Sequence, residues 1–206
     1  MNEQINVDAL IEAYQEIATS TIGHLLDEGH IPDVFPLSTR HKVVALIRTA
    51  KLQSVNASQL RQVLLQAQAN EVLVIDARHE PDRACWGEQR SIAAIHCGLA
   101  GVVVLGAVTD RLALQQLKLP IFAYGISCKT TRAEGESRVE IDTKIEMPTC
   151  TVHSGDLLIA DADGVFVLSL DVAAHYLAQF QQIEWDEKQK KAEFFQQEDV
   201  HKYYFK

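Results

Sequence analysis

The sequence is poor in cysteine and proline and has no long hydrophobic run. It holds 4 cysteines and 5 prolines in 206 residues, and no apolar stretch approaches the roughly 20 residues of a membrane-spanning helix. The cysteines form no C-x-x-C pair, so a disulfide framework is not indicated. The start of the chain also lacks the basic and apolar segments of a secretory signal. We therefore expect a cytoplasmic protein with reduced thiols and no membrane association.

Positive charge is scarce as well. The chain has 19 Lys and Arg residues against 28 Asp and Glu residues, a net charge of −9 at pH 7. A field of this sign repels the phosphate backbone, which argues against direct binding of nucleic acid. The length predicts one domain over residues 1–206, with N-terminal helices within 1–30 and a C-terminal helix and tail over 171–206.

Several motifs of nucleotide-binding proteins and hydrolases are missing. There is no G-x-G-x-x-G, no Walker A sequence and no G-x-S-x-G. The 8 histidines show none of the spacings typical of a zinc site. Dinucleotide binding, P-loop chemistry and serine hydrolysis are therefore not expected.

Apolar β-branched runs alternate with amphipathic segments through the first two thirds of the chain, which indicates an α/β fold with a parallel or mixed sheet and covering helices. The predicted strands are 42–50, 71–77, 101–105 and 121–124, and the predicted helices between them are 58–68, 87–97 and 109–117.

The pattern changes after Gly125. Short extended pieces and a hairpin turn at 161–164 predict antiparallel strands. Residues 171–195 predict a long helix of mixed charge that carries several aromatic side chains. Two interpretations of these aromatics stay open: core contacts within a largely solvated helix, or docking on a neighbouring subunit.

The first candidate site is Gly87-Glu88-Gln89-Arg90, where a predicted helix follows a buried strand. The first N–H groups of a helix lack internal partners and attract anions, and Gly87 permits a close approach of the backbone. A carboxylate or a phosphate fits such a place. The alternative is a simple tight turn in which Glu88 complements the helix dipole.

The second candidate site is Asp110, which follows Thr109 just after the buried strand 101–105. A carboxylate there can hold a hydrated Mg²⁺ or Mn²⁺. The alternative is that Thr109 or Asp110 only caps the next helix. If the strands 71–77 and 101–105 are parallel neighbours, both candidate sites open at the same sheet edge. By contrast, Lys129, Arg132 and Arg138 are interpreted as solvated loop charges.

Three segments carry a resemblance to a known family. They are WGEQRSIAAIHCGLAGVVVLGAVTDRLALQQLKLPIFAYG, SGDLLIADADGVFVL and TSTIGHLLD. Together they resemble the family of the regulator of ribonuclease activity A and 4-hydroxy-4-methyl-2-oxoglutarate aldolase. The similarity covers roughly residues 17–185 and is most specific between Gly87 and Gly125 and over 155–167.

The resemblance implies a fold and an assembly. The fold is a swivelling β/β/α sandwich of the RraA-like, phosphohistidine-domain-like kind, assembled as a homotrimer or a hexamer. For the aldolase branch it implies a divalent-metal reaction, with Mg²⁺ or Mn²⁺, on a small pyruvate-derived 2-oxo acid. Gly87 to Arg90 then match the loop that holds the substrate carboxylate.

The chain departs from the family pattern in a position that matters for this chemistry. The family motif G-x-V-R-D reads Gly106-Ala107-Val108-Thr109-Asp110 here, so the metal-binding aspartate is kept and the substrate arginine is replaced by Thr109. A hydroxyl cannot make the paired hydrogen bonds of a guanidinium. Arg111 and Arg90 are the candidate substitutes.

The chain shows two further departures. The family's aspartate in the N-terminal helix is His24 here, and its glycine-rich loop is replaced by the bulkier and more charged segment 76–83. The resemblance also implies an acid that aldolases bring to a neighbouring site from the C-terminal helix, for which Glu184 and Glu187 are both candidates.

Two functions follow from the resemblance. The first is a metal-dependent lyase of the hydroxymethyl-oxoglutarate aldolase or oxaloacetate decarboxylase type, with Asp110, Thr109 and Arg111 as catalytic residues. The second is a non-catalytic regulator that presents an acidic surface to a ribonuclease-type protein partner.

Overall fold

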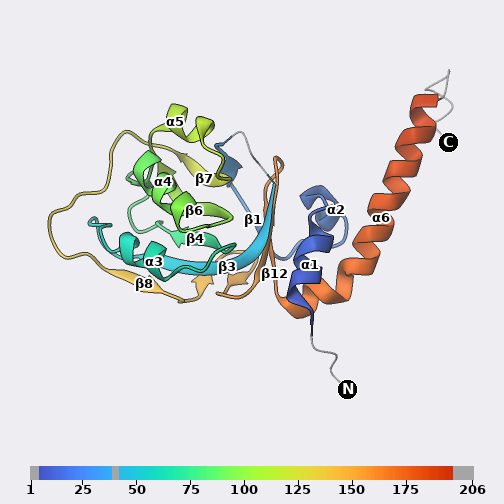
Figure 1. Cartoon of the computed structure of the whole chain (residues 1–206), viewed down its shortest axis with the longest axis horizontal. Coiled ribbons are helices and arrows are strands. Elements are labelled where there is room, and N and C mark those ends of the chain that lie inside the picture. The colour runs from blue at the N-terminus through green and yellow to red at the C-terminus, as the bar shows by residue number, and fades with distance from the viewer. Residues whose placement is uncertain (1–4, 39–41, 197–206) are drawn as a thin grey trace.

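A computed structural model describes residues 5–38 and 42–196 of the chain. Its centre is a mixed sheet of ten strands (Figure 1), eight of which follow the order β1-β12-β11-β3-β4-β6-β7-β2, while β5 pairs with β6 and β8 pairs with β3. The bounds of these strands are β1 His30–Ile31, β2 Phe35–Pro36, β3 Val43–Leu52, β4 Val72–Asp76, β5 Ala84–Trp86, β6 Gly101–Val108, β7 Ile121–Ile126, β8 Val139–Ile141, β11 Leu157–Ala160 and β12 Val165–Leu168.

The parallel half of the sheet consists of β3, β4, β6 and β7. The residues of β4 pair with those of β6 from Val72 opposite Gly101 to Asp76 opposite Leu105. The prediction that these two strands are parallel neighbours is therefore confirmed. Their carboxyl ends lie at one sheet edge, where ligand sites in such sheets are found.

The antiparallel half is built on the first residues of β3. They pair with β11, which pairs with β12 through the predicted hairpin turn, and β12 pairs with β1. In that turn the N–H of Asp161 donates to the carbonyl of Gly164 at 3.0 Å. A separate hairpin joins β9 (Ile145–Glu146) to β10 (Thr151–Val152).

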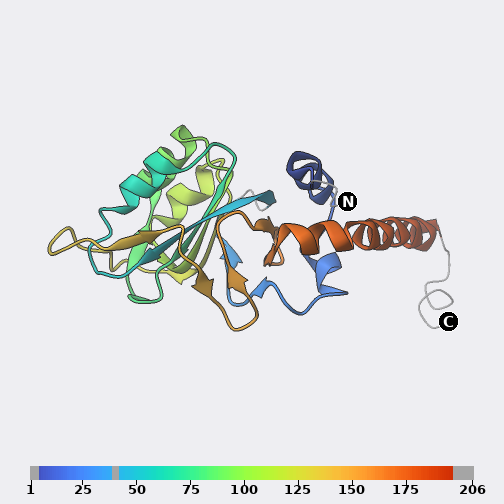
Figure 2. The ribbon, with the colours of Figure 1, turned by 90° about the horizontal axis from the view of Figure 1, so that it is seen from below.

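Three helices cover the parallel half (Figure 1): α3 (Leu60–Gln66), α4 (Glu88–His96) and α5 (Arg111–Gln116). The other three lie beyond the antiparallel half: α1 (Val7–Tyr14), α2 (Thr19–Gly23) and α6 (Leu170–Gln196). Figure 2 shows α6 extending away from the sheets. The expected mixed α/β fold with covering helices and a long C-terminal helix is confirmed.

The core follows from the side-chain alternation of the strands. In β6, Val102 and Val104 face the helices α3 to α5, while Val103 and Leu105 face the antiparallel half. A third apolar cluster joins the outer face of β11 and β12 to α1, α2 and α6. The molecule therefore has four layers: the helices α3 to α5, the parallel half of the sheet, the antiparallel half, and the helices α1, α2 and α6.

The structure corrects several predicted boundaries and adds one strand. The strands predicted to end at 50, 105 and 124 continue to Leu52, Val108 and Ile126, and β5 was not predicted. The longer β6 and the additional β5 are linked, because Ala84 and Trp86 pair with Ala107 and Val108 and extend the ladder. A three-residue strand that depends on a distant partner leaves no periodic signal in the sequence.

The structure supports a core contact for one aromatic side chain of α6, and docking on a neighbouring subunit stays a prediction. Phe180 is fully buried and packs edge-on against Tyr14 of α1, with ring centroids 6.1 Å apart. Trp185 is 58% exposed. Within the described residues, no helix combines the length and the apolar character needed to cross a membrane.

Tyr14→Phe tests how α1 is held on α6. The buried Tyr14 hydroxyl donates to the carbonyl of Ala173 at 2.9 Å. Removing it leaves that carbonyl without this donor while the ring keeps its packing. We expect the free energy of unfolding to fall by about 1 kcal/mol, measured by urea denaturation. Tyr14→Leu, which also removes the ring, serves as the more damaging comparison. A Phe variant as stable as the native chain would contradict this account.

Candidate functional site

A cavity of about 260 Å³ lies where the loops after β5, β6 and β7 meet. It contains residues of both sites predicted from the sequence, which come together as expected for parallel neighbouring strands. The lining residues are Asn56, Ala57, Ser58, Ala84, Trp86, Gly87, Gln89, Arg90, Thr109, Asp110, Thr130, Thr131, Arg132 and Ala133.

A glycine is required at position 87 because the backbone there lies very close to Thr109 and Asp110. Gly87 precedes the first residue of α4 in an extended conformation, with φ −169°. A Cβ on Gly87 would lie 2.5 Å from Oδ2 of Asp110 and 2.8 Å from Cγ2 of Thr109. Only a residue without a side chain lets the two loops come this near to each other.

Asp110 joins the two loops through its side chain. Its Oδ2 accepts a hydrogen bond from the N–H of Glu88, the first residue of α4, at 3.0 Å. The residue has a left-handed backbone with φ 58° and precedes α5, but its side chain makes no capping hydrogen bond there. The alternative of a simple helix cap is therefore wrong for the Asp110 side chain, which serves α4 instead of α5.

The remaining N–H groups at the start of α4 are available to a ligand. Among the described residues, the amides of Gln89 and Arg90 show no hydrogen-bond partner. Such N–H groups attract an anion, and the helix dipole adds to the effect. The Glu88 side chain is only partly exposed and does not line the cavity, so Glu88 contributes through its backbone.

The two arginines proposed to replace the missing family arginine lie in different places. Arg111 is exposed and is not among the residues that line the cavity. Arg90 lines it, and its guanidinium donates to the carbonyls of Cys85 at 2.7 Å and Ala57 at 3.1 Å. Burial lowers the pKa of Arg90, but a guanidinium stays charged at neutral pH.

Arg132 is a second arginine on the cavity wall; it is exposed, in agreement with the predicted loop charge, but its place beside the site was not predicted. Its backbone N–H donates to the carbonyl of Val55 at 3.1 Å. Next to it, Nδ2 of the buried Asn56 donates to the carbonyls of Ala133 and Gly135 at 2.9 and 2.7 Å. The loop that carries Arg132 is thus fixed across the cavity from α4.

The electrostatic character of this cavity differs from that of the whole chain. Among the described residues, neither Arg90 nor Arg132 takes part in an ion pair, whereas Arg48, Arg78 and Arg138 are paired with carboxylates. Asp110 is the one acidic side chain in the lining described above. In a chain of net charge −9, this is a local surplus of positive charge suited to an anionic ligand.

Asp110 fits a hydrated divalent cation held by few protein groups. Its other oxygen, Oδ1, has only the hydroxyl of Thr109 at 3.4 Å, and the residue is exposed. No group of three or more His, Cys, Asp or Glu side chains suited to a metal is found in the described part of the chain. Mg²⁺ commonly keeps several waters and takes one or two carboxylates, which agrees with this arrangement.

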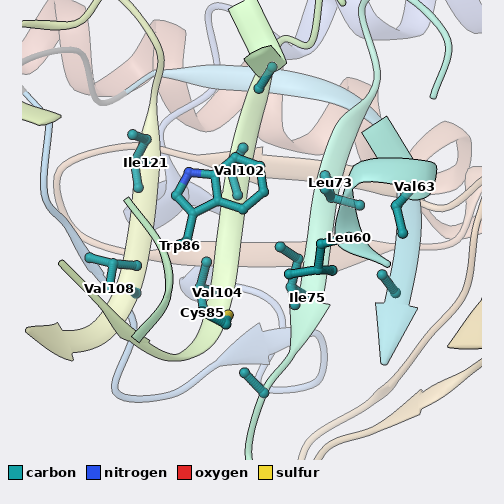
Figure 3. Close-up of a cluster of buried hydrophobic side chains, with 14 of the residues drawn as sticks. Leu60, Val63, Leu73, Ile75, Cys85, Trp86, Val102, Val104, Val108 and Ile121 are labelled. Atoms are coloured by element: carbon teal, nitrogen blue, oxygen red, sulfur yellow. The ribbon is translucent and has the colours of Figure 1, made fainter. Parts of the chain in front are cut away.

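Cys85 is not a nucleophile of this site. Figure 3 shows it beside Val104 in the core under the indole of Trp86. Burial raises its pKa to about 12, so the thiol stays protonated at neutral pH.

The acids of the C-terminal helix bind elsewhere on the same chain. Oε1 of Glu184 accepts hydrogen bonds from the N–H of Ala18 at 2.8 Å and the hydroxyl of Thr21 at 2.6 Å. Glu187 lies 3.3 Å from Nε2 of His24. Both carboxylates therefore hold α6 against α2 within this protomer.

Comparisons with known proteins identify the family of this chain. A sequence model of the RraA-like family, Aldolase/RraA, matches residues 15–167. The chain belongs to the RraA-like family. This RraA-like protein is 31% identical over 155 residues to the 4-hydroxy-4-methyl-2-oxoglutarate aldolase of Thermus thermophilus, with 74% of this chain and 93% of the relative covered. It is 30% identical over 167 residues to a candidate aldolase of the same name from Halalkalibacterium halodurans, with 80% and 78% covered.

Solved structures confirm the fold of this RraA-like protein. An uncharacterized protein of Pseudomonas syringae superimposes with a TM-score of 0.82 at 18% identity, covering 95% of this chain and 96% of that one. The RNA-processing inhibitor RraA of Thermus thermophilus has a TM-score of 0.65 at 27% identity, covering 74% and 92%.

Gly87→Ala tests the contact between the two loops. The added Cβ must displace the Asp110 carboxylate from the Glu88 N–H. We expect the melting temperature to fall by about 3 °C, which corresponds to about 1 kcal/mol at this chain length. We also expect the Glu88 amide resonance to shift. Gly125→Ala is the matched control, because its Cβ meets nothing within 4 Å. Equal effects of the two substitutions would contradict the close approach.

Proposed function

We propose that this RraA-like protein is a divalent-metal-dependent lyase that cleaves a pyruvate-derived 2-oxo acid of the hydroxymethyl-oxoglutarate or oxaloacetate type. The observation that carries the proposal is the hydrogen bond of 3.0 Å from the Glu88 N–H to Oδ2 of Asp110. It brings an anion-binding helix start and a carboxylate for a cation into one cavity. An aldolase-named relative at 31% identity supports the same chemistry.

The helix start holds the substrate carboxylate in this proposal. The amides of Gln89 and Arg90 point out of the first turn of α4, where an anion gains both hydrogen bonds and the helix dipole. Arg90 adds charge from the cavity wall. Its guanidinium has five donors, of which two are bound to carbonyls, and no further partner is found for it within residues 5–38 and 42–196.

Asp110 and Thr109 lie directly beside the helix start. Asp110 would hold the cation, Mg²⁺ or Mn²⁺. When bound, such an ion supplies Lewis-acid polarisation of the 2-oxo group, so that negative charge left by carbon–carbon cleavage is stabilised. Thr109 offers one hydroxyl where the family has an arginine, so the positive charge comes from Arg90 and Arg132 across the cavity.

Asp110→Asn tests the metal role. The amide keeps an oxygen that can accept from the Glu88 N–H, but the negative charge is lost. We expect oxaloacetate decarboxylation in the presence of Mg²⁺ to fall about 100-fold or more, measured by pyruvate release after subtraction of the rate without protein. A chelator should abolish the native rate. Asp163→Asn, in the exposed turn between β11 and β12, is the matched control. Equal rates in all arms would overturn the proposal.

Arg132→Gln tests the wall opposite α4. A substrate with a second carboxylate would meet Arg132, so we expect the native protein to prefer 2-oxoglutarate over 2-oxopentanoate, which has the same chain length but a terminal methyl group. The variant should lose about tenfold in affinity for the dianion and nothing for the monoanion, by calorimetry. Arg138→Gln, on the same loop but paired with Glu136 at 2.7 Å, should keep the preference. A native protein without any preference would refute the role of Arg132.

A second candidate function is the non-catalytic regulator that binds a ribonuclease-type protein partner. The observation in its favour is Thr109 at the place of the family's substrate arginine. The assays above separate the two functions. A native chain without turnover or affinity for 2-oxo acids, but with salt-sensitive binding to a basic protein partner, would favour the regulator.

A further inference from the structure

A hydrogen-bonded chain runs from the core to the start of α4. The indole Nε1 of Trp86 donates to Oγ of Ser91 at 2.8 Å, and this hydroxyl lies 2.8 Å from the carbonyl oxygen of Gly87. Trp86 is 1% exposed and Ser91 is fully buried. Neither side chain has access to water as a substitute partner.

The direction of this chain follows from the chemistry of its members. An indole N–H can only donate, and a serine hydroxyl has a single proton. Because Ser91 accepts from Trp86, its own proton is directed to the Gly87 carbonyl. That carbonyl also accepts from the backbone N–H of Ser91 at 3.1 Å, so it is bound by two donors.

The Gly87 carbonyl and the Glu88 N–H belong to one planar peptide unit. Fixing the direction of the carbonyl therefore fixes the direction of the N–H, which points the opposite way. The carbonyl faces the buried Ser91, and the N–H faces Oδ2 of Asp110 at 3.0 Å. Gly87 has no side chain that would restrain this peptide.

Trp86 also restrains the other loop. Its carbonyl accepts the N–H of Thr109 at 2.9 Å, and Thr109 directly precedes Asp110. One residue thus fixes the helix start through its indole and the Asp110 loop through its backbone. Hydrogen bonds to a carbonyl also polarise the peptide, which strengthens its N–H as a donor.

We propose that Trp86 and Ser91 form a positioning pair that aims the Glu88 N–H at the Asp110 carboxylate and so sets the first turn of α4, whose next two amides face the anion of the site. The inference rests on the proposed function for the identity of that anion, the carboxylate of a 2-oxo acid. The buried indole of Trp86 and the buried hydroxyl of Ser91 act through the peptide between Gly87 and Glu88.

The test compares Ser91→Ala, Trp86→Phe and the double variant, each as the full chain with Mg²⁺. Ser91→Ala removes the proton that holds the Gly87 carbonyl, so KM for oxaloacetate should rise about fivefold, the size of one ordinary hydrogen bond, while kcat changes less. In Trp86→Phe the Ser91 hydroxyl loses the donor that fixes its direction but can still donate to Gly87, so KM should rise by less than in Ser91→Ala.

The double variant separates positioning from stability. It removes the buried indole N–H that Ser91→Ala leaves unpaired, so its melting temperature should fall by less than the sum of the falls in the two single variants. Its KM should stay as high as in Ser91→Ala. Ser154→Ala, which removes the hydroxyl 3.0 Å from that of the buried Thr49, is a control that alters stability outside this cavity. If KM rises in proportion to the loss of melting temperature in all variants, Ser154→Ala included, the proposed positioning role of Trp86 and Ser91 is overturned.

A second readout works without turnover. In the protein alone, the Glu88 amide resonance should shift in Ser91→Ala and remain in place in Ser154→Ala. If the native chain neither turns over oxaloacetate nor binds pyruvate, the proposed function fails, and this resonance still decides the positioning pair. A Glu88 resonance unchanged in Ser91→Ala would refute it.

Discussion

The site depends on one hydrogen bond between a backbone amide and a carboxylate. The Glu88 N–H and the Asp110 side chain come from loops that follow different strands. An aspartate at this point satisfies a helix amide that would otherwise lack a partner, and the helix dipole favours the negative charge. The contact requires a glycine at position 87, and it turns Asp110 away from the helix that it precedes. This contact brings both candidate loops to the wall of one cavity.

Much of the fold was predictable because its signals are local. Apolar runs of strand length and the helix signals between them indicated the parallel half, and β4 and β6 are parallel neighbours as predicted. The Gly87 loop is brought to the Asp110 loop by β5, which pairs with the end of β6. The resemblance of the segment 86–125 supplied the family. The elements that were missed depend on distant partners. β5 exists because Ala84 and Trp86 pair with the end of β6, and Arg132 reaches the cavity because Asn56 holds its loop. Neither of these contacts produces a periodic pattern in the sequence. The only signal for Arg132 was its positive charge in an acidic chain.

The charge of the whole chain and that of its cavity have opposite signs. A protein of net charge −9 repels small anions at long range, although this effect is screened beyond about 8 Å at physiological salt. Within the cavity the helix amides, Arg90 and Arg132 face the ligand at short range, where screening is weak. Selectivity for an anionic ligand therefore comes from the local arrangement of donors and not from the overall field.

The ten residues of β3 have a consequence for how the molecule unfolds. From Val43 to Leu46 the strand pairs with β11, and from Ile47 to Lys51 it pairs with β4. One strand therefore belongs to both halves, and removing either half would leave a row of its buried polar groups unpaired. Because the two halves share this strand, one half cannot unfold while the other keeps its complete set of strand hydrogen bonds. Hydrogen exchange along β3 is then governed by opening of the entire molecule.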